Sequence, residues 1–131
     1  MLQYTEGTWT PVIAGTTTAG AGTYTLQTGT YTRMGNLCFL AGTVTWTAHT
    51  GTGNMLLTGL PFTSRTLANY KYSFEIISIN INFPAGTISV EGSLPSTSTQ
   101  LTLQSIRDNN TQLAFSMDIA GTISVTGFYL I

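Results

Sequence analysis

Threonine and glycine alternate with short apolar runs along most of this chain, and the pattern predicts β-strands. In residues 23–26 the apolar side chains fall on one face and the threonines on the other, and residues 29–33 repeat this alternation. Strict alternation of apolar and polar positions is typical of a half-buried strand. Met34-Gly35-Asn36 then offers a tight turn before the next apolar run, so we predict a β-hairpin at this point.

The strand after this turn is apolar on both faces in its first half. The face that we assign to the core carries Cys38, Leu40, Val44 and Trp46. The opposite face begins with Leu37, Phe39 and Ala41 and turns polar from Thr43 onward. An antiparallel strand usually shows one face to water, so two apolar faces require cover on both. We therefore predict that a second subunit, or a long loop, covers Leu37, Phe39 and Ala41.

Turn residues and further alternating runs divide the rest of the chain into strands and loops. We expect strands at residues 8–13, 70–83, 86–94, around 101–103, 112–119 and 122–131, and polar loops at 15–22, 48–54 and 96–99. No window shows helical periodicity over three turns, and the four prolines fall in loops or at strand edges. About eight short antiparallel strands around one core favour an all-β fold, an antiparallel β-sandwich of jelly-roll-like type, over a closed barrel.

Length and charge narrow the possible partners. A chain of 131 residues forms one domain, here residues 1–131, around a single core. Charged residues make up only 7% of the chain, against about 25% in a typical soluble domain. The four basic side chains are scattered and the net charge is −1, which argues against nucleic-acid binding. The sequence also lacks a membrane-spanning apolar run and a secretory leader pattern, so we expect a soluble protein without membrane insertion.

Few side chains are available for catalysis or for binding a metal. Cys38 and His49 are the only cysteine and the only histidine, which excludes clusters of these ligands, and Cys38 fits a small buried hydrophobe. An oxygen-ligand cation at the Asp108-Asn109-Asn110 turn stays open as an alternative. Glu75 and Glu91 can meet across neighbouring strands, as glycoside hydrolysis requires, but we interpret them as solvated or hydrogen-bonded strand carboxylates. We predict no catalytic residues, no metal and no cofactor.

Sugar binding is the ligand chemistry that this composition supports best. It needs exposed aromatic rings for the apolar face of a pyranose, together with amides and other groups that hydrogen-bond to hydroxyls. The candidates are Trp9, His49, Asn54, Asn69, Tyr70 and Tyr72. Trp9 has the alternative of packing at a subunit interface, and His49 that of a surface hydrogen-bonding residue. The loop at residues 48–54 is the richest in polar side chains.

Three segments, in this order, resemble a known family. They are GTWTPVIAG at residues 7–15, GTYTLQTGTYTRMGNLCFLAGTVTW at 22–46 and HTGTGNMLLTGLPFTS at 49–64. Together they are similar to the C-terminal domains of bacteriophage tail fibres and tailspikes, whereas residues 65–131 carry no such signature. The resemblance implies a homotrimeric β-rich module of the virion, made in the host cytoplasm and attached to upstream fibre or tailspike domains. Met1 is compatible with an authentic start, an internal start or an artificial boundary.

The resemblance leads to a functional hypothesis with one main alternative. We expect a non-catalytic receptor-binding module that trimerises the fibre and contacts bacterial surface carbohydrate during host attachment. The alternative is a purely structural trimerisation and capping module without a ligand. A glycan-degrading domain is a distant third, because it would depend on Glu75 and Glu91.

Overall fold

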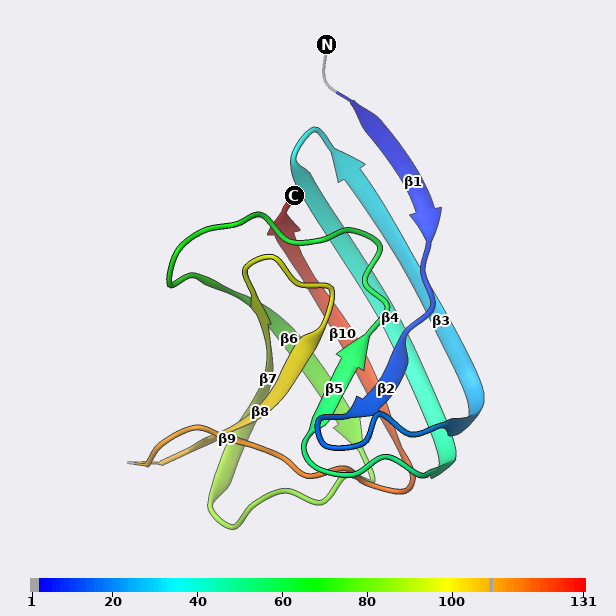
Figure 1. Cartoon of the computed structure of the whole chain (residues 1–131), viewed down its shortest axis with the longest axis vertical. Coiled ribbons are helices and arrows are strands. Elements are labelled where there is room, and N and C mark those ends of the chain that lie inside the picture. The colour runs from blue at the N-terminus through cyan, green and yellow to red at the C-terminus, as the bar shows by residue number, and fades with distance from the viewer. Residues whose placement is uncertain (1–2, 109) are drawn as a thin grey trace.

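The described residues of the computed structural model, 3–108 and 110–131, form ten β-strands and no helix (Figure 1). The strands are β1 (Tyr4–Thr8), β2 (Val12–Gly15), β3 (Gly22–Met34), β4 (Leu37–His49), β5 (Met55–Thr58), β6 (Lys71–Ile79), β7 (Thr87–Pro95), β8 (Leu101–Arg107), β9 (Leu113–Ala114) and β10 (Gly121–Leu130). All pairings are antiparallel. Within the described part of the chain, nothing resembles a helix long and apolar enough to cross a membrane.

The strands belong to one strongly curled sheet. Their order is β1-β3-β4-β10-β6-β7-β8-β5-β2, with β9 beside β8. β1 and β2 lie at opposite ends of this order although only three residues separate them, so the sheet must curl back on itself. Right-handed strand twist and the register shifts around Tyr24 in β3 favour this curvature. The prediction of an all-β antiparallel fold is confirmed, whereas the two-sheet sandwich is replaced by this half-barrel.

The predicted hairpin is present, but three predicted strands differ, and the strand expected at residues 70–83 is the shorter β6, which ends at Ile79. β3 and β4 pair from Met34↔Leu37 onward, so the turn lies at Gly35 as expected. The expected strand at residues 8–13 is broken, because Trp9 bonds its N–H to the carbonyl of Gly29 and Pro11 has no N–H. The expected strand at 112–119 is limited to β9, since the N–H of Met117 donates to Gly53 instead of continuing a ladder.

The hydrophobic core fills the concave, inner face of the curled sheet. β4 directs Cys38, Leu40, Val44 and Trp46 into it, as predicted, and all four are buried. β10 adds Ile123, Val125 and Tyr129, and β6 adds Tyr72, Phe74 and Ile76. Each buried apolar side chain of this size contributes about 1.5–3 kcal/mol of transfer free energy. The alternate residues of the same strands point to the opposite, outer face of the sheet.

Candidate functional site

Trp9 lies inside the protomer and not at its surface. Its indole Nε1 donates to the carbonyls of Thr30 and Ala41, at 3.2 Å each. The ring covers the paired glycines Gly29 and Gly42, where an added Cβ would approach it to 2.7 and 2.6 Å. Only 6% of Trp9 is exposed, so this residue offers no exposed sugar platform, and its ring already packs within the protomer.

His49 is a structural residue of the same region. The N–H of Gly51 donates to its Nδ1 at 2.8 Å, so Nε2 carries the hydrogen and donates to the carbonyl of Ile13 at 2.7 Å. Tyr24 also binds Ile13, because its hydroxyl accepts from the N–H at 3.1 Å and donates to the carbonyl at 3.2 Å. These side chains take the place of a strand pairing between β2 and the β3–β4 hairpin. We call Trp9, Tyr24 and His49 the seam.

The remaining sugar-binding candidates lie in two separate places. Asn69, Tyr70 and Tyr72 lie together at the beginning of β6, where the ring centroids of Tyr70 and Tyr72 are 4.9 Å apart, and Asn54 lies elsewhere. Tyr72 is buried against Tyr129, so it offers no exposed ring. Tyr70 is 51% exposed and follows the exposed Asn69, at the beginning of β6. Asn54 is exposed too, but it precedes β5. β5 runs antiparallel to β6 in the sheet, so the starts of these two strands lie at opposite ends of it.

Large apolar side chains gather on the outer face instead. Phe39 of β4 and Phe128 of β10 are cross-strand partners and are 48% and 61% exposed. On β6, Ile77 and Ile79 are 67% and 55% exposed. No loop of the described residues covers Phe39, so the predicted cover by a loop is absent from the protomer. Exposure of four such side chains on one sheet face is a feature typical of contact surfaces.

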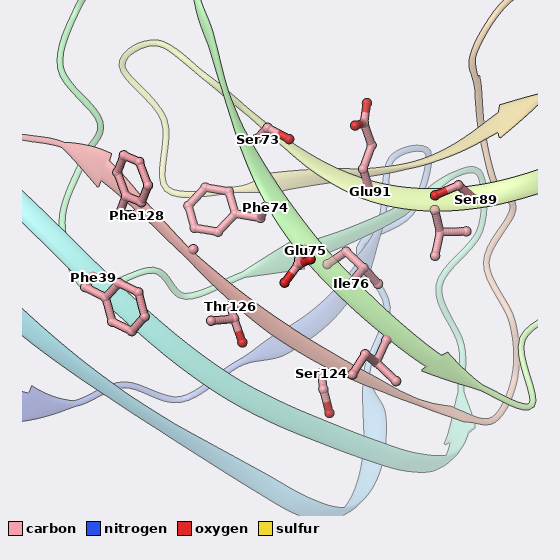
Figure 2. A pocket seen from close by; sticks show the side chains of 13 residues that line it. Phe39, Ser73, Phe74, Glu75, Ile76, Ser89, Glu91, Ser124, Thr126 and Phe128 are labelled. Atoms are coloured by element: carbon pink, nitrogen blue, oxygen red, sulfur yellow. The ribbon is translucent and has the colours of Figure 1, made fainter.

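A groove of about 680 Å³ crosses this outer face between β4 and β7. β10 and β6 pair only as far as Thr126↔Glu75, and beyond this point the strands diverge. The ring of Phe74 lies beside Gly127 in the widened space, and Figure 2 shows it between the two strands. Phe39 and Phe128 lie on one side of the groove and Ser73, Ser89 and Glu91 on the other. We call this the outer groove.

Two glutamates line the outer groove. Glu75 and Glu91 are direct partners in the β6–β7 register, as predicted for neighbouring strands, and Figure 2 shows their carboxylates pointing away from each other. The amide Nε2 of Gln112 donates to Oε1 of Glu91 at 2.7 Å. Hydroxyl groups of Ser73, Ser124 and Thr126 also line the groove. The arrangement can accept hydrogen bonds from hydroxyl or ammonium groups and offers aromatic rings beside them.

The described residues hold no group of three or more His, Cys, Asp or Glu side chains that could bind a metal. The alternative cation site at Asp108-Asn109-Asn110 includes Asn109, which lies outside the described residues. Sequence analysis missed Phe128 and the exposed isoleucines of the outer face. The alternation of strand faces would have predicted that Phe128 points outward, because Val125 and Tyr129 face the core and Phe128 lies on the opposite face from both.

Cys38 is the buried hydrophobe that the sequence predicts. Burial raises the pKa of its thiol, and the neighbouring Tyr129 partly opposes this shift. Burial raises the pKa of Tyr129 as well, with Cys38 adding to the effect. The Tyr129 hydroxyl donates to the carbonyl of Phe62 at 2.8 Å and accepts from its N–H at 3.2 Å. Both groups are therefore held neutral in the core, away from the outer groove.

Comparison with known proteins gives one informative likeness. No protein-family model matches the sequence, and no curated protein matches it. Among solved structures, the crystal structure of Dettilon tailspike protein (gp208) superposes with a TM-score of 0.74 at 21% sequence identity. The chain has the fold of part of a phage tailspike. The likeness covers 96% of this chain and 23% of the tailspike chain, so this domain spans about a quarter of that protein's length.

Proposed function

We propose that this chain is a non-catalytic module of a phage tailspike or tail fibre, a virion component that assembles as a homotrimer through its outer face. The observation that carries the proposal is the exposure of Phe39, Phe128, Ile77 and Ile79 on that face. The tailspike-like fold supports the virion context and the presence of further domains in the same protein. Leu37 and Ala41, which flank Phe39 on β4, belong to the proposed contact.

Assembly suits this face because it removes apolar surface from water. Each square ångström of apolar surface buried contributes roughly 25 cal/mol, and the chain has few charges with which to keep such a surface hydrated. A trimer of identical chains would bury three copies of the same interface and hold three fibre chains in register. Upstream domains of a tailspike would then extend from a closed, stable base.

Light scattering coupled to size-exclusion chromatography tests the assembly. We expect a mass of three times the 14.0 kDa protomer at micromolar concentration. Phe39→Glu should reduce the mass to that of one protomer, because an unpaired carboxylate buried in the interface costs several kcal/mol. A wild-type chain that elutes as a monomer contradicts the proposal. A trimer that survives Phe39→Glu would move the interface away from Leu37, Phe39 and Ala41.

Contact with bacterial surface carbohydrate is the second candidate function, and the outer groove favours it, with a sugar competing with a neighbouring protomer for Phe39 and Phe128. The rings of Phe39 and Phe128 can pack on the apolar face of a sugar, while Glu75 and Glu91 can accept hydrogen bonds from its hydroxyls. Two carboxylates without a basic side chain in the lining favour a neutral or amino sugar over an acidic one. Tyr70, Asn69 and Asn54 stay predicted contacts at other points of the surface.

A glycan array with the isolated domain separates the two candidates. Binding that is lost in Phe128→Ala, with folding intact, supports carbohydrate contact at the outer groove. Failure of the intact trimer to bind any glycan supports the purely structural module. Incubation of bound glycans with the wild-type domain should leave their chain length unchanged, and degradation that Glu75→Gln or Glu91→Gln abolishes would contradict a non-catalytic role.

A further inference from the structure

The apolar residues of the outer face form two patches that differ in shape and chemistry. Phe39 and Phe128, partners across β4 and β10, form the aromatic patch. Ile77 and Ile79, which alternate along the outer side of β6, form the isoleucine patch. Between them lie the polar residues Ser124, Thr126 and Glu75, with Thr126 opposite Glu75 and Ser124 opposite Ile77. The patches therefore flank a polar strip that belongs to the outer groove.

Closed rotational symmetry assigns different roles to two such patches. A twofold dimer uses one surface patch twice, whereas a cyclic trimer joins two different surfaces of the same chain head to tail. A face directed toward a threefold axis meets one neighbour with one flank and the other neighbour with the opposite flank. The aromatic patch and the isoleucine patch are two flanks of one face.

We propose that the aromatic patch of one protomer packs against the isoleucine patch of the next, and that three such contacts close the trimer. This inference rests on the homotrimer of the proposed function and names the surfaces that form it. Phe128 and Ile77 are the central residues, since each is the more exposed member of its patch. The polar strip with Glu75 and Thr126 then faces the threefold axis.

The charges of the outer face favour a second copy of this chain as the occupant. Lys71 and Glu75 share the outer side of β6, and among the described residues neither side chain has a hydrogen-bond or ion-pair partner. By contrast, Arg33, Arg65 and Arg107 donate to backbone carbonyls of their own protomer. A neighbouring copy brings both a lysine and a glutamate that can pair with them. Isoleucines offer no ring face or hydrogen bond to a sugar, and a carboxylate between the patches disfavours a lipid surface.

Complementation between two variants tests the pairing. Phe128→Glu disables the aromatic patch and leaves the isoleucine patch, whereas Ile77→Glu does the reverse. Each variant alone should fall from three protomer masses to one in light scattering. A one-to-one mixture keeps one intact contact and should form a heterodimer of twice 14.0 kDa. Ile88→Glu is the matched control, because Ile88 is 68% exposed and belongs to neither patch, and it should remain trimeric.

A charge pair within one chain gives the second arm. Phe128→Glu combined with Ile77→Lys places opposite charges on the two surfaces that we expect to meet, and should restore the trimer that each single change abolishes. Circular dichroism confirms that every variant is folded, and Phe128→Ser and Ile77→Ser replace any charged variant that is not.

The outcomes separate this inference from the function on which it rests. A monomeric wild type overturns the homotrimer and the pairing together. A trimeric wild type whose Phe128→Glu and Ile77→Glu variants both remain trimeric overturns the pairing alone. Monomeric single variants that form no heterodimer and are not rescued by the charge pair also overturn it, because the two patches then do not contact each other.

Discussion

The seam and the outer face use similar residues in opposite ways. At the seam, each side-chain polar atom of Trp9, Tyr24 and His49 finds a backbone partner, Trp9 and His49 are buried, and Tyr24 is partly buried. On the outer face, Phe39 and Phe128 are about half exposed and contact no covering element. A residue whose contacts are complete within the protomer contributes to folding. A residue whose ring is left partly uncovered is available for contact with a partner. The difference separates aromatic residues that complete their contacts within the protomer from those that do not.

Trp9→Ala should produce the largest loss of stability. Removal of a buried tryptophan costs about 3–5 kcal/mol, and here the carbonyls of Thr30 and Ala41 also lose their donor. Phe128→Ala is the matched change on the outer face and should alter the unfolding free energy of the monomer by less than about 0.5 kcal/mol. Urea unfolding, measured at a concentration at which the protomers are dissociated, compares the two. Equal losses would remove the distinction between the regions.

Gly42→Ala should cost about 1–3 kcal/mol, because the new Cβ would lie 2.6 Å from the Trp9 ring. Gly92→Ala is the control, since its Cβ would come no closer than 3.3 Å to Ile76 and Phe74. In a Trp9→Ala background the cost of Gly42→Ala should largely disappear. The double-mutant cycle thus measures the coupling between the ring and the glycine. Additive effects would show that the clash is relieved elsewhere.

The sequence predicts the hairpin and the inward face of β4 because both depend on local information. Alternation with period two fixes which residues share a face, and Gly35 supplies the turn. The same alternation identified Phe39 as an outward apolar residue and would have identified Phe128 as one too. The single curled sheet could not be predicted, because it depends on which strands pair across long separations. A sandwich and a half-barrel have the same pattern of alternation.

The seam explains why the sugar-binding list contained structural residues. His49 and Ile13 are 36 positions apart, and no local pattern indicates that one binds the other. A tryptophan next to a proline has the same sequence pattern whether its ring is exposed or packed against two glycines. The outer groove escaped prediction for a related reason. The groove depends on the point, at Thr126 and Glu75, where β10 and β6 stop pairing. That point is set by the way the strands twist apart in the fold and not by the sequence of either strand.

His49→Ala should lower the unfolding free energy by about 1–3 kcal/mol, because the Gly51 N–H loses its acceptor and the Ile13 carbonyl keeps only the Tyr24 hydroxyl as a side-chain donor. Glycan binding and trimer mass should not change if the folded population is the same. Asn54→Ala is the control in the same loop region, since the Asn54 side chain is exposed. Loss of glycan binding in a His49→Ala domain of unchanged stability would return this residue to the functional side of the comparison.

The smallest expected effect is the pH dependence of the buried inner face. The pKa values of Cys38, Tyr24 and Tyr129 are all raised by burial above their ordinary values of 9.0, 10.0 and 10.0. Above those values the unfolded chain releases protons that the folded protein keeps, so stability is complete below about pH 9 and falls as the pH rises. Each fully titrating group contributes a slope of about 1.4 kcal/mol per pH unit.

Tyr129→Phe should therefore reduce the slope above pH 10, although it lowers stability at neutral pH by removing the two hydrogen bonds to Phe62. Tyr24→Phe should reduce the slope in the same direction at the seam. The measurement is urea unfolding between pH 8 and pH 11, on monomers. A slope that persists in the Tyr129→Phe and Tyr24→Phe variants would place the titrating groups outside the core and weaken the contrast between the two faces.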